Sequence, residues 1–130
     1  MSELNEVIVK KIEPVYTDER GSIMDLLNEK LNHVGLIVTE AGATRGNHYH
    51  KLSTQYSYIL SGKFEVLIAK SDSPKDVKKI ILEAGEIMTI PPGIIHRFKA
   101  IEKATMIDMI SESRDGNSYE EDVVRVEIQE

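Results

Sequence analysis

Short apolar runs rich in β-branched residues, separated by turn-forming residues, extend along almost the whole chain. Each run is five or six residues long, which favours strands over helices. The predicted strands cover residues 7–12, 34–38, 56–60, 64–69, 77–82, 86–90, 95–99, 105–110 and 123–128. Strands repeated at this spacing are typical of a β-sandwich or β-barrel. The pattern therefore predicts an all-β protein.

Two connections in this series carry specific expectations. Residues 56–60 and 64–69 are joined by Ser61-Gly62-Lys63, a short glycine-containing loop that predicts a β-hairpin. Residues 114–118 are rich in turn formers and predict a break before the last strand, and residues 26–31 offer at most one helical turn. The chain has 130 residues without repeats or long linkers, so we expect one domain over residues 1–130.

Composition narrows the functional classes. The net charge is -6 at pH 7, which argues against nucleic acid as a partner. The chain contains no cysteine, which excludes disulfides and a thiolate nucleophile. No apolar stretch approaches the ~20 residues that a membrane span needs, and the first residues lack a signal-peptide pattern. We therefore expect no membrane association and a cytoplasmic location.

Three of the four histidines lie in two short stretches that suggest one site. His48 and His50 alternate as neighbours on one face of a strand do, and His96 follows the turn formed by residues 91–93. Neutral imidazoles bind several divalent transition metals. With Gln55 these histidines predict a cage for manganese, iron, nickel, cobalt or zinc. Because all four ligands are neutral, the metal would be bound weakly and would be strongly Lewis acidic.

The same histidines are also suited to acid–base catalysis, because imidazole titrates near neutral pH. In that interpretation His48 or His50 moves the proton, and Tyr49 or Tyr58 supplies an opposing acid. Asp108 lies within an apolar run, where it either orients a histidine or marks an exposed strand face. The remaining histidine, His33, has no partner nearby in the sequence and is expected to be structural.

Basic residues near the histidines suggest an anionic ligand. Arg45 and Lys51 flank the pair His48 and His50, and Arg97 follows His96. Guanidinium groups bind phosphate in bidentate fashion, so these residues could hold a phosphorylated substrate. Arg20, in Asp18-Glu-Arg-Gly21, is a fourth candidate for the same role. The alternative is that all four simply form a solvated surface.

The two histidine stretches resemble the paired motifs of the cupin superfamily. The residues in the register of the first motif are Gly42, His48, His50, Gln55 and Gly62, with glutamine in place of the usual acid. Those in the register of the second are Gly85, Pro91, Gly93 and His96, with Ala100 in place of the usual asparagine. The resemblance implies a double-stranded β-helix, a jelly-roll barrel, but not a reaction, because one fold supports many chemistries.

Within the cupins, two enzyme groups are most similar. Asp18-Glu-Arg20-Gly21 followed by Arg45-Gly46-Asn-His48 resembles the signature of dTDP-4-dehydrorhamnose 3,5-epimerases. That likeness implies that Arg20 and Arg45 contact the nucleotide diphosphate and that His48 is the base. The stretch 45–51 with Gln55 and residues 91–93 is similar also to dTDP-sugar 3,4-ketoisomerases, in which a His-x-His pair moves protons without a metal.

These observations support three hypotheses. The first is an isomerase or epimerase of a nucleotide-linked keto-deoxysugar. The second is a metal-dependent oxygenase, such as a dioxygenase, and the third is a cupin that binds a sugar or another small ligand without catalysis. We also expect a homodimer, because a small barrel exposes edges and faces that need cover, and residues 56–60 offer two tyrosines and a leucine for it.

Overall fold

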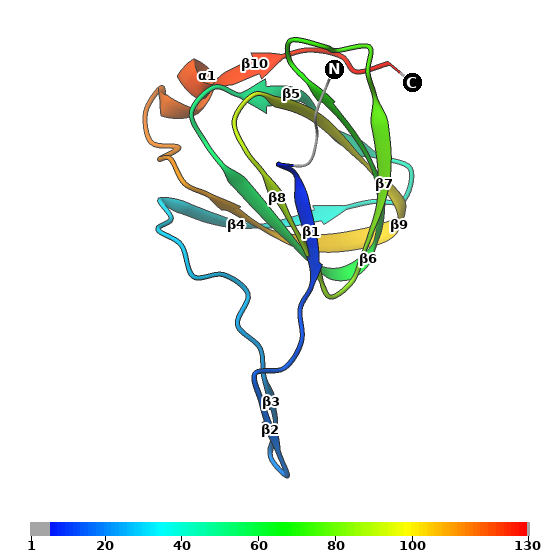
Figure 1. Ribbon diagram of the computed structural model, residues 1–130, viewed down its shortest axis with the longest axis vertical. Coiled ribbons are helices and arrows are strands. Elements are labelled where there is room, and N and C mark those ends of the chain that lie inside the picture. The colour runs from blue at the N-terminus through cyan, green and yellow to red at the C-terminus, as the bar shows by residue number, and fades with distance from the viewer. Residues whose placement is uncertain (1–5, 130) are drawn as a thin grey trace.

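The computed structural model describes residues 6–129 and shows a β-barrel with a two-stranded arm (Figure 1). The strands are β1 (Ile8–Lys11), β2 (Tyr16–Asp18), β3 (Gly21–Ile23), β4 (His33–Thr39), β5 (Thr44–His50), β6 (Gln55–Lys70), β7 (Lys78–Glu83), β8 (Glu86–Ile90), β9 (Ile94–Ile110) and β10 (Val123–Arg125). A short helix, α1 (Ser118–Asp122), precedes β10. The all-β jelly-roll fold expected from the sequence is confirmed.

Two long strands build the barrel. β6 and β9 pair antiparallel from Gln55↔Ile110 to Lys70↔Ile94. The first part of β6 also pairs with β8 and its second part with β7, while β9 pairs with β5 and then with β4. Because each long strand changes its outer neighbour halfway, the sheet bends and wraps around a common interior. This arrangement brings β5, β6 and β9 to one pocket. These strands carry the four predicted metal ligands, which are His48, His50, Gln55 and His96.

The predicted hairpin between residues 56–60 and 64–69 is wrong. Both runs belong to β6 and pair with β9, not with each other, and register shifts mark the junction at residues 59–64. Gly62 has φ 86°, and a Cβ there would lie 2.4 Å from the carbonyl oxygen of Lys103. The glycine therefore permits a bulge in a continuous strand at close backbone contact, a role that gives the same local sequence signal as a turn.

The last segment also differs from the sequence expectation. Residues 118–122 form α1, and only Val123–Arg125 of the predicted final strand pairs, with β5. Residues 26–31 form neither a helical turn nor a strand. They pack over Tyr58 through Leu26, Leu27 and Leu31, so their leucines cover the barrel without regular structure.

Apolar side chains of the long strands fill the barrel beside the histidine pocket. The largest buried cluster comprises Ile59, Phe64, Val66, Ile68, Leu82, Met88, Ile90, Ile94, Phe98, Ala100, Ala104 and Met106. Phe64 and Phe98 meet edge to face with ring centroids 5.4 Å apart. This packed core fixes β6 and β9, and with them the side chains that these strands direct into the pocket.

A β2–β3 hairpin extends away from the barrel as an arm (Figure 1). Arg20 lies at its turn, where the side chain is 79% exposed and forms an ion pair with Asp18 at 2.7 Å. Within residues 6–129, no helix has the length and apolarity that crossing a membrane requires.

A histidine pocket as the candidate active site

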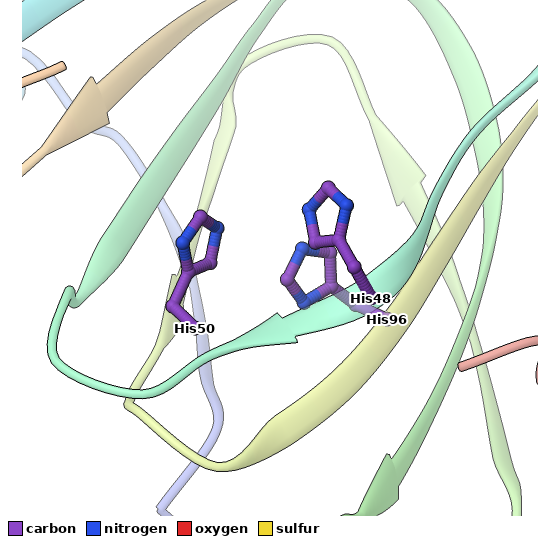
Figure 2. A group of neighbouring side chains, drawn as sticks. All are labelled: His48, His50 and His96. Carbon is purple, nitrogen blue, oxygen red and sulfur yellow. The ribbon is translucent and has the colours of Figure 1, made fainter. Parts of the chain in front are cut away.

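His48, His50 and His96 converge on one pocket, as Figure 2 shows. His48 pairs across the strands with His96, so both side chains project from the same face of the sheet. The ring centroids lie 5.1 Å apart for His48 and His50 and 4.7 Å apart for His48 and His96. The pocket has a volume of about 370 Å³, which suits a small organic molecule or part of one.

His50 is oriented by a buried carboxylate that the sequence did not reveal. Its Nδ1–H donates to Oδ2 of Asp122 at 2.9 Å, and both side chains are more than 90% buried. Asp122 also accepts hydrogen bonds from the Leu52 N–H at 2.6 Å and from the Ser53 hydroxyl at 2.6 Å. A histidine–carboxylate pair of this kind fixes the ring and stabilises a proton arriving at its other nitrogen.

The pKa of Asp122 keeps this carboxyl group ionised. Burial raises that pKa, but the hydrogen bonds from Ser53, Leu52 and His50 outweigh burial and hold it below its ordinary value. The residue stands at the end of the acidic run 120–122, which in the sequence looks like a solvated helix face. Asp122 is recognised only by its hydrogen bonds to His50, Leu52 and Ser53, which lie far away in the chain. No local pattern in the sequence therefore indicates its role.

A chain of polar side chains continues from His50 along β6 to β9. His50 Nε2 lies 3.2 Å from Oε1 of Gln55, whose amide N–H donates to the Ser57 hydroxyl at 3.0 Å. Ser57 in turn donates to Oδ1 of Asp108 at 3.2 Å. Asp108 is 6% exposed, so it does not mark an exposed face, and among the described residues it is linked to His50 only through Ser57 and Gln55. Burial raises its pKa above the ordinary value.

His96 presents a free nitrogen to the pocket. Its Nδ1–H donates to the carbonyl oxygen of Ile94 at 3.0 Å, which leaves Nε2 as the unprotonated atom of a neutral ring. Burial, with smaller contributions from His48 and His50, lowers the pKa of His96 to about 3. Nε2 is buried and has no hydrogen-bond partner within residues 6–129. This lone pair is therefore available for a ligand.

His48 is neutral at neutral pH. Burial lowers its pKa to about 4, and positive charge on His50, Arg125 and Arg114 adds to that shift. A histidine with so low a pKa returns a proton readily once it has received one. His48 and His50 thus differ in their surroundings: one is close to guanidinium groups, and the other is paired with a carboxylate.

The proposed metal ligands come together in the pocket. Nitrogen atoms of His48, His50 and His96 all lie within 4.8 Å of one another. The amide oxygen of Gln55 adjoins His50 and lines the same pocket. Three imidazoles and an amide fit a divalent transition metal by ligand type, and the unpartnered His96 Nε2 fits it as well.

The structure separates the two tyrosines named in the sequence from the histidines. Tyr49 lies between His48 and His50 and therefore points to the opposite face of β5, where it packs against Leu67, Ala69, Ile95 and Ile128. Tyr58 is buried in another apolar cluster beneath the segment 26–31. The phenol that does line the pocket is that of Tyr119 in α1, with its ring centroid 6.4 Å from that of His50.

Of the four basic residues expected to bind substrate, only Arg45 lines the pocket. Arg45 donates to the Thr39 hydroxyl at 2.8 Å and to the carbonyl oxygen of Val38 at 2.9 Å. Arg20 lies on the arm, Lys51 is exposed outside the pocket lining, and Arg97 is paired with Glu65 at 3.1 Å. Arg114 and Arg125, which the sequence analysis did not select, line the pocket instead.

The comparison with protein families settles the family. A family model described as cupin matches residues 19–124. The chain belongs to the cupins. This confirms the resemblance that the two histidine motifs indicated, and it accounts for the convergence of His48, His50 and His96 in one barrel. A comparison with curated proteins returns no significant match.

Solved structures of nucleotide-sugar enzymes share this cupin fold. A variant of the 3,4-ketoisomerase QdtA from Thermoanaerobacterium thermosaccharolyticum, in complex with TDP-4-keto-6-deoxyglucose, is 22% identical at a TM-score of 0.75 and covers 95% of this chain and 89% of its own. A 3,4-ketoisomerase from Helicobacter canadensis is 20% identical at 0.76, covering 92% and 90%. A dTDP-4-dehydrorhamnose 3,5-epimerase from Sulfolobus tokodaii is 20% identical at 0.66, covering 86% and 73%.

Proposed function

We propose that this cupin is an isomerase or epimerase of a nucleotide-linked keto-deoxysugar that works by histidine-mediated proton transfer. The observation that carries the proposal is the pairing of His50 with buried Asp122 beside the neutral His48 in one pocket. The fold's similarity to 3,4-ketoisomerases and a 3,5-epimerase supports the same substrate class.

In the proposed reaction, one histidine takes the proton from the carbon beside the ketone, and an enediolate forms. Asp122 supports positive charge on His50, so His50 is suited to accept this proton. The neutral His48 can receive the proton of the neighbouring hydroxyl group, and its low pKa then favours delivery of that proton to the former ketone oxygen, while His50 returns its proton to carbon. The sugar undergoes no net oxidation or reduction. The proton returns to the same carbon or to an adjacent carbon, and the product is an isomer of the substrate.

Replacing each histidine separately tests these roles. We expect His50→Asn and His48→Asn to lower the rate of solvent deuterium incorporation into dTDP-4-keto-6-deoxyglucose by about 100-fold or more, the range for loss of a general acid or base. His33→Asn is the matched control, because His33 lies on β4 outside the pocket lining. Full exchange in both pocket variants would contradict the proposal.

A metal-dependent oxygenase is the second candidate, supported by the unpartnered Nε2 of buried His96. His48, His50, His96 and Gln55 would hold the ion, manganese, iron, nickel, cobalt or zinc. A bound metal would supply Lewis acidity or an oxygen-binding centre. Elemental analysis of protein purified without a nickel column tests this: stoichiometric metal that His96→Ala removes favours the oxygenase. Ligand binding with neither exchange nor metal would instead indicate a non-catalytic binding cupin.

A homodimer remains part of the proposal, with its surface revised. Tyr58 is buried within its own chain, so of the apolar residues at 56–60 only Leu60 is largely exposed, at 53%. The outward side chains of β4 are a better candidate, because Val34, Leu36 and Val38 alternate along a strand whose described neighbour is β9 alone. Such a strand exposes both an apolar face and unpaired backbone groups.

A further inference from the structure

Two arginines of the C-terminal segment line the histidine pocket together with Arg45. Arg114 lies between β9 and α1, and Arg125 ends β10. Figure 1 shows α1 and β10 beside β5, at the same end of the barrel. The two carboxylates in the lining, Asp108 and Asp122, are buried and held by hydrogen bonds. The exposed charge at this rim is therefore mainly that of the guanidinium groups.

Strand register directs Arg125 toward the histidines. β10 pairs antiparallel with β5, and Arg125 stands directly opposite His48. Residues directly opposite in an antiparallel pair project to the same face of the sheet. The Arg125 side chain is 62% exposed and contacts Glu120 in bidentate fashion, at 3.0 and 3.2 Å. An exposed ion pair of this kind contributes little to stability, so a doubly charged phosphate can compete with Glu120.

Arg114 lies over an aromatic ring. Its guanidinium carbon lies 4.1 Å from the ring centroid of Tyr119, which itself lines the pocket. Stacking of this type orients the guanidinium plane and leaves its N–H groups free to donate. Arg114 forms no ion pair with any carboxylate in the described part of the chain.

The charges of both arginines reach into the pocket. Burial is the largest cause of the low pKa of His48, and Arg125 and Arg114 lower it further. Arg114 also acts against the upward shift that burial imposes on the pKa of Asp108. The positive field at the rim therefore extends to the groups at which chemistry is proposed.

The segment that carries these arginines is fixed to the barrel. β10 pairs with β5, and the backbone N–H of Lys51 donates to the carbonyl oxygen of Asp122 at 2.8 Å. The Asp122 side chain holds the loop at residues 52–53 together with His50. The backbone that carries Arg125 is therefore already in place when a ligand binds, which lowers the entropy cost of binding.

We propose that Arg114 and Arg125 form the binding site for the diphosphate group of the substrate, with its sugar placed among the three histidines. The inference rests on the proposed function for the sugar, but the anion site itself requires only an organic diphosphate. Guanidinium forks match phosphate oxygens in number and geometry. Because the same segment supplies Asp122, binding of the diphosphate also holds the carboxylate that orients His50.

Calorimetric titration with dTDP at low ionic strength tests this site. We expect Arg114→Gln and Arg125→Gln each to weaken binding about tenfold or more, the loss typical of one hydrogen bond to a charged group, and the double variant to weaken it further. Lys103→Gln is the matched control: it also removes one exposed positive charge, paired with Glu40 at 3.6 Å, but outside the pocket lining. Unchanged affinity in the double variant would overturn the inference.

Two further measurements separate this inference from the proposed function. Inorganic pyrophosphate should compete with dTDP in the wild type and lose that ability in the double variant, whereas thymidine should not compete. If dTDP binding depends on the arginines but no keto-sugar shows isotope exchange, the proposed anion site stands and the proposed isomerase activity is wrong. If the double variant exchanges with unaltered kinetics, the isomerase proposal stands and the anion site is wrong. A wild type that binds neither dTDP nor pyrophosphate would also overturn the inference.

Discussion

At the scale of single residues, the environment of each histidine determines what it can do. His50 has a carboxylate at Nδ1, His48 lies near guanidinium groups, and His96 bonds a backbone carbonyl and offers a bare Nε2. Three chemically identical side chains are therefore suited to three different roles in proton transfer or ligand binding. For His50 and His48 the differences come from residues outside the two histidine motifs, whereas the Ile94 carbonyl that fixes His96 lies within the second motif.

Asp122→Asn should reduce turnover while leaving the barrel folded. The amide retains one oxygen that can accept from Ser53 or Leu52, but it lacks the charge that supports a proton on His50. We expect kcat to fall about 100-fold, with a smaller change in KM. Circular dichroism is the control for folding. Wild-type kcat in this variant would show that the carboxylate only anchors the C-terminal segment.

The buried His96 should make stability depend on pH in a defined direction. Its pKa is about 3 in the fold against an ordinary value of 6.5, so between these values the unfolded chain binds the extra proton. Burial of neutral His96 therefore leaves the free energy of unfolding unaffected by this proton above pH 6.5. As the pH falls from 6.5 towards 3, protonation of the unfolded chain lowers the free energy of unfolding. At pH 5 the loss is about 2 kcal/mol relative to neutral pH.

Urea unfolding at pH 7 and pH 5 measures this effect. The difference in the free energy of unfolding between the two pH values should shrink in His96→Gln, whatever that substitution does to stability at pH 7. His33→Gln is the comparison for loss of a histidine outside the pocket. An equal pH difference in the wild type and His96→Gln would contradict the assigned environment.

Local alternation predicted part of the site from the sequence. It places His48 and His50 on one face of β5, and the same rule places Tyr49 on the other face, where it packs in an apolar cluster. Asp122, Tyr119, Arg114 and Arg125 were missed because a C-terminal segment reaches the pocket only through β10–β5 pairing. No short motif encodes a contact made over some 70 residues, such as that between His50 and Asp122.

At the scale of elements, the long strands β6 and β9 decide the architecture. Their bulged junction allows one strand to serve both sides of the barrel. The sequence predicted strands at both ends of each long element, but not their continuity. In β6 the reason is that Ser61 and Gly62 give the same signal in a turn and in a bulge. Long-range pairing with β9 decided between the two.

Gly62→Ala should destabilise the protein much more than Gly42→Ala. Both glycines have nearly the same φ, 86° and 85°. The free-energy cost of placing an alanine in this left-handed conformation is therefore similar at the two positions. A Cβ at Gly62 would collide with backbone atoms of residues 103 and 104, whereas Gly42 has nothing within 4 Å. Chemical unfolding should show a difference of at least about 2 kcal/mol. Equal losses would show that the close contact at the bulge relaxes freely.

At the scale of the whole molecule, exposed apolar surface on β4 and on the arm is the basis of the proposed homodimer. Leu36 is 66% exposed and Val34 is 59% exposed, while Tyr16 and Ile23 on the arm are both more than half exposed. Apolar surface of this kind is costly in a monomer and is typical of interfaces. A second copy of the chain would cover it.

Leu36→Lys should convert the proposed dimer to a monomer. A charge in the middle of the β4 face would be desolvated at the interface without a partner. Light scattering at micromolar concentration should give the dimer mass for the wild type and for Leu60→Lys, an exposed leucine away from β4 that serves as the matched control. A monomeric wild type would contradict the assembly, and a dimeric Leu36→Lys variant would exclude this face.

The central claim is that the histidine pocket moves a proton on a nucleotide-linked keto-sugar. Proton NMR of dTDP-4-keto-6-deoxyglucose in D₂O, with chelator-treated wild-type protein, tests it most directly. We expect the signal of the hydrogen beside the ketone to disappear and an isomer containing deuterium to accumulate, because the pocket histidines exchange their protons with solvent. A signal that persists unchanged over many hours at micromolar protein would contradict the claim.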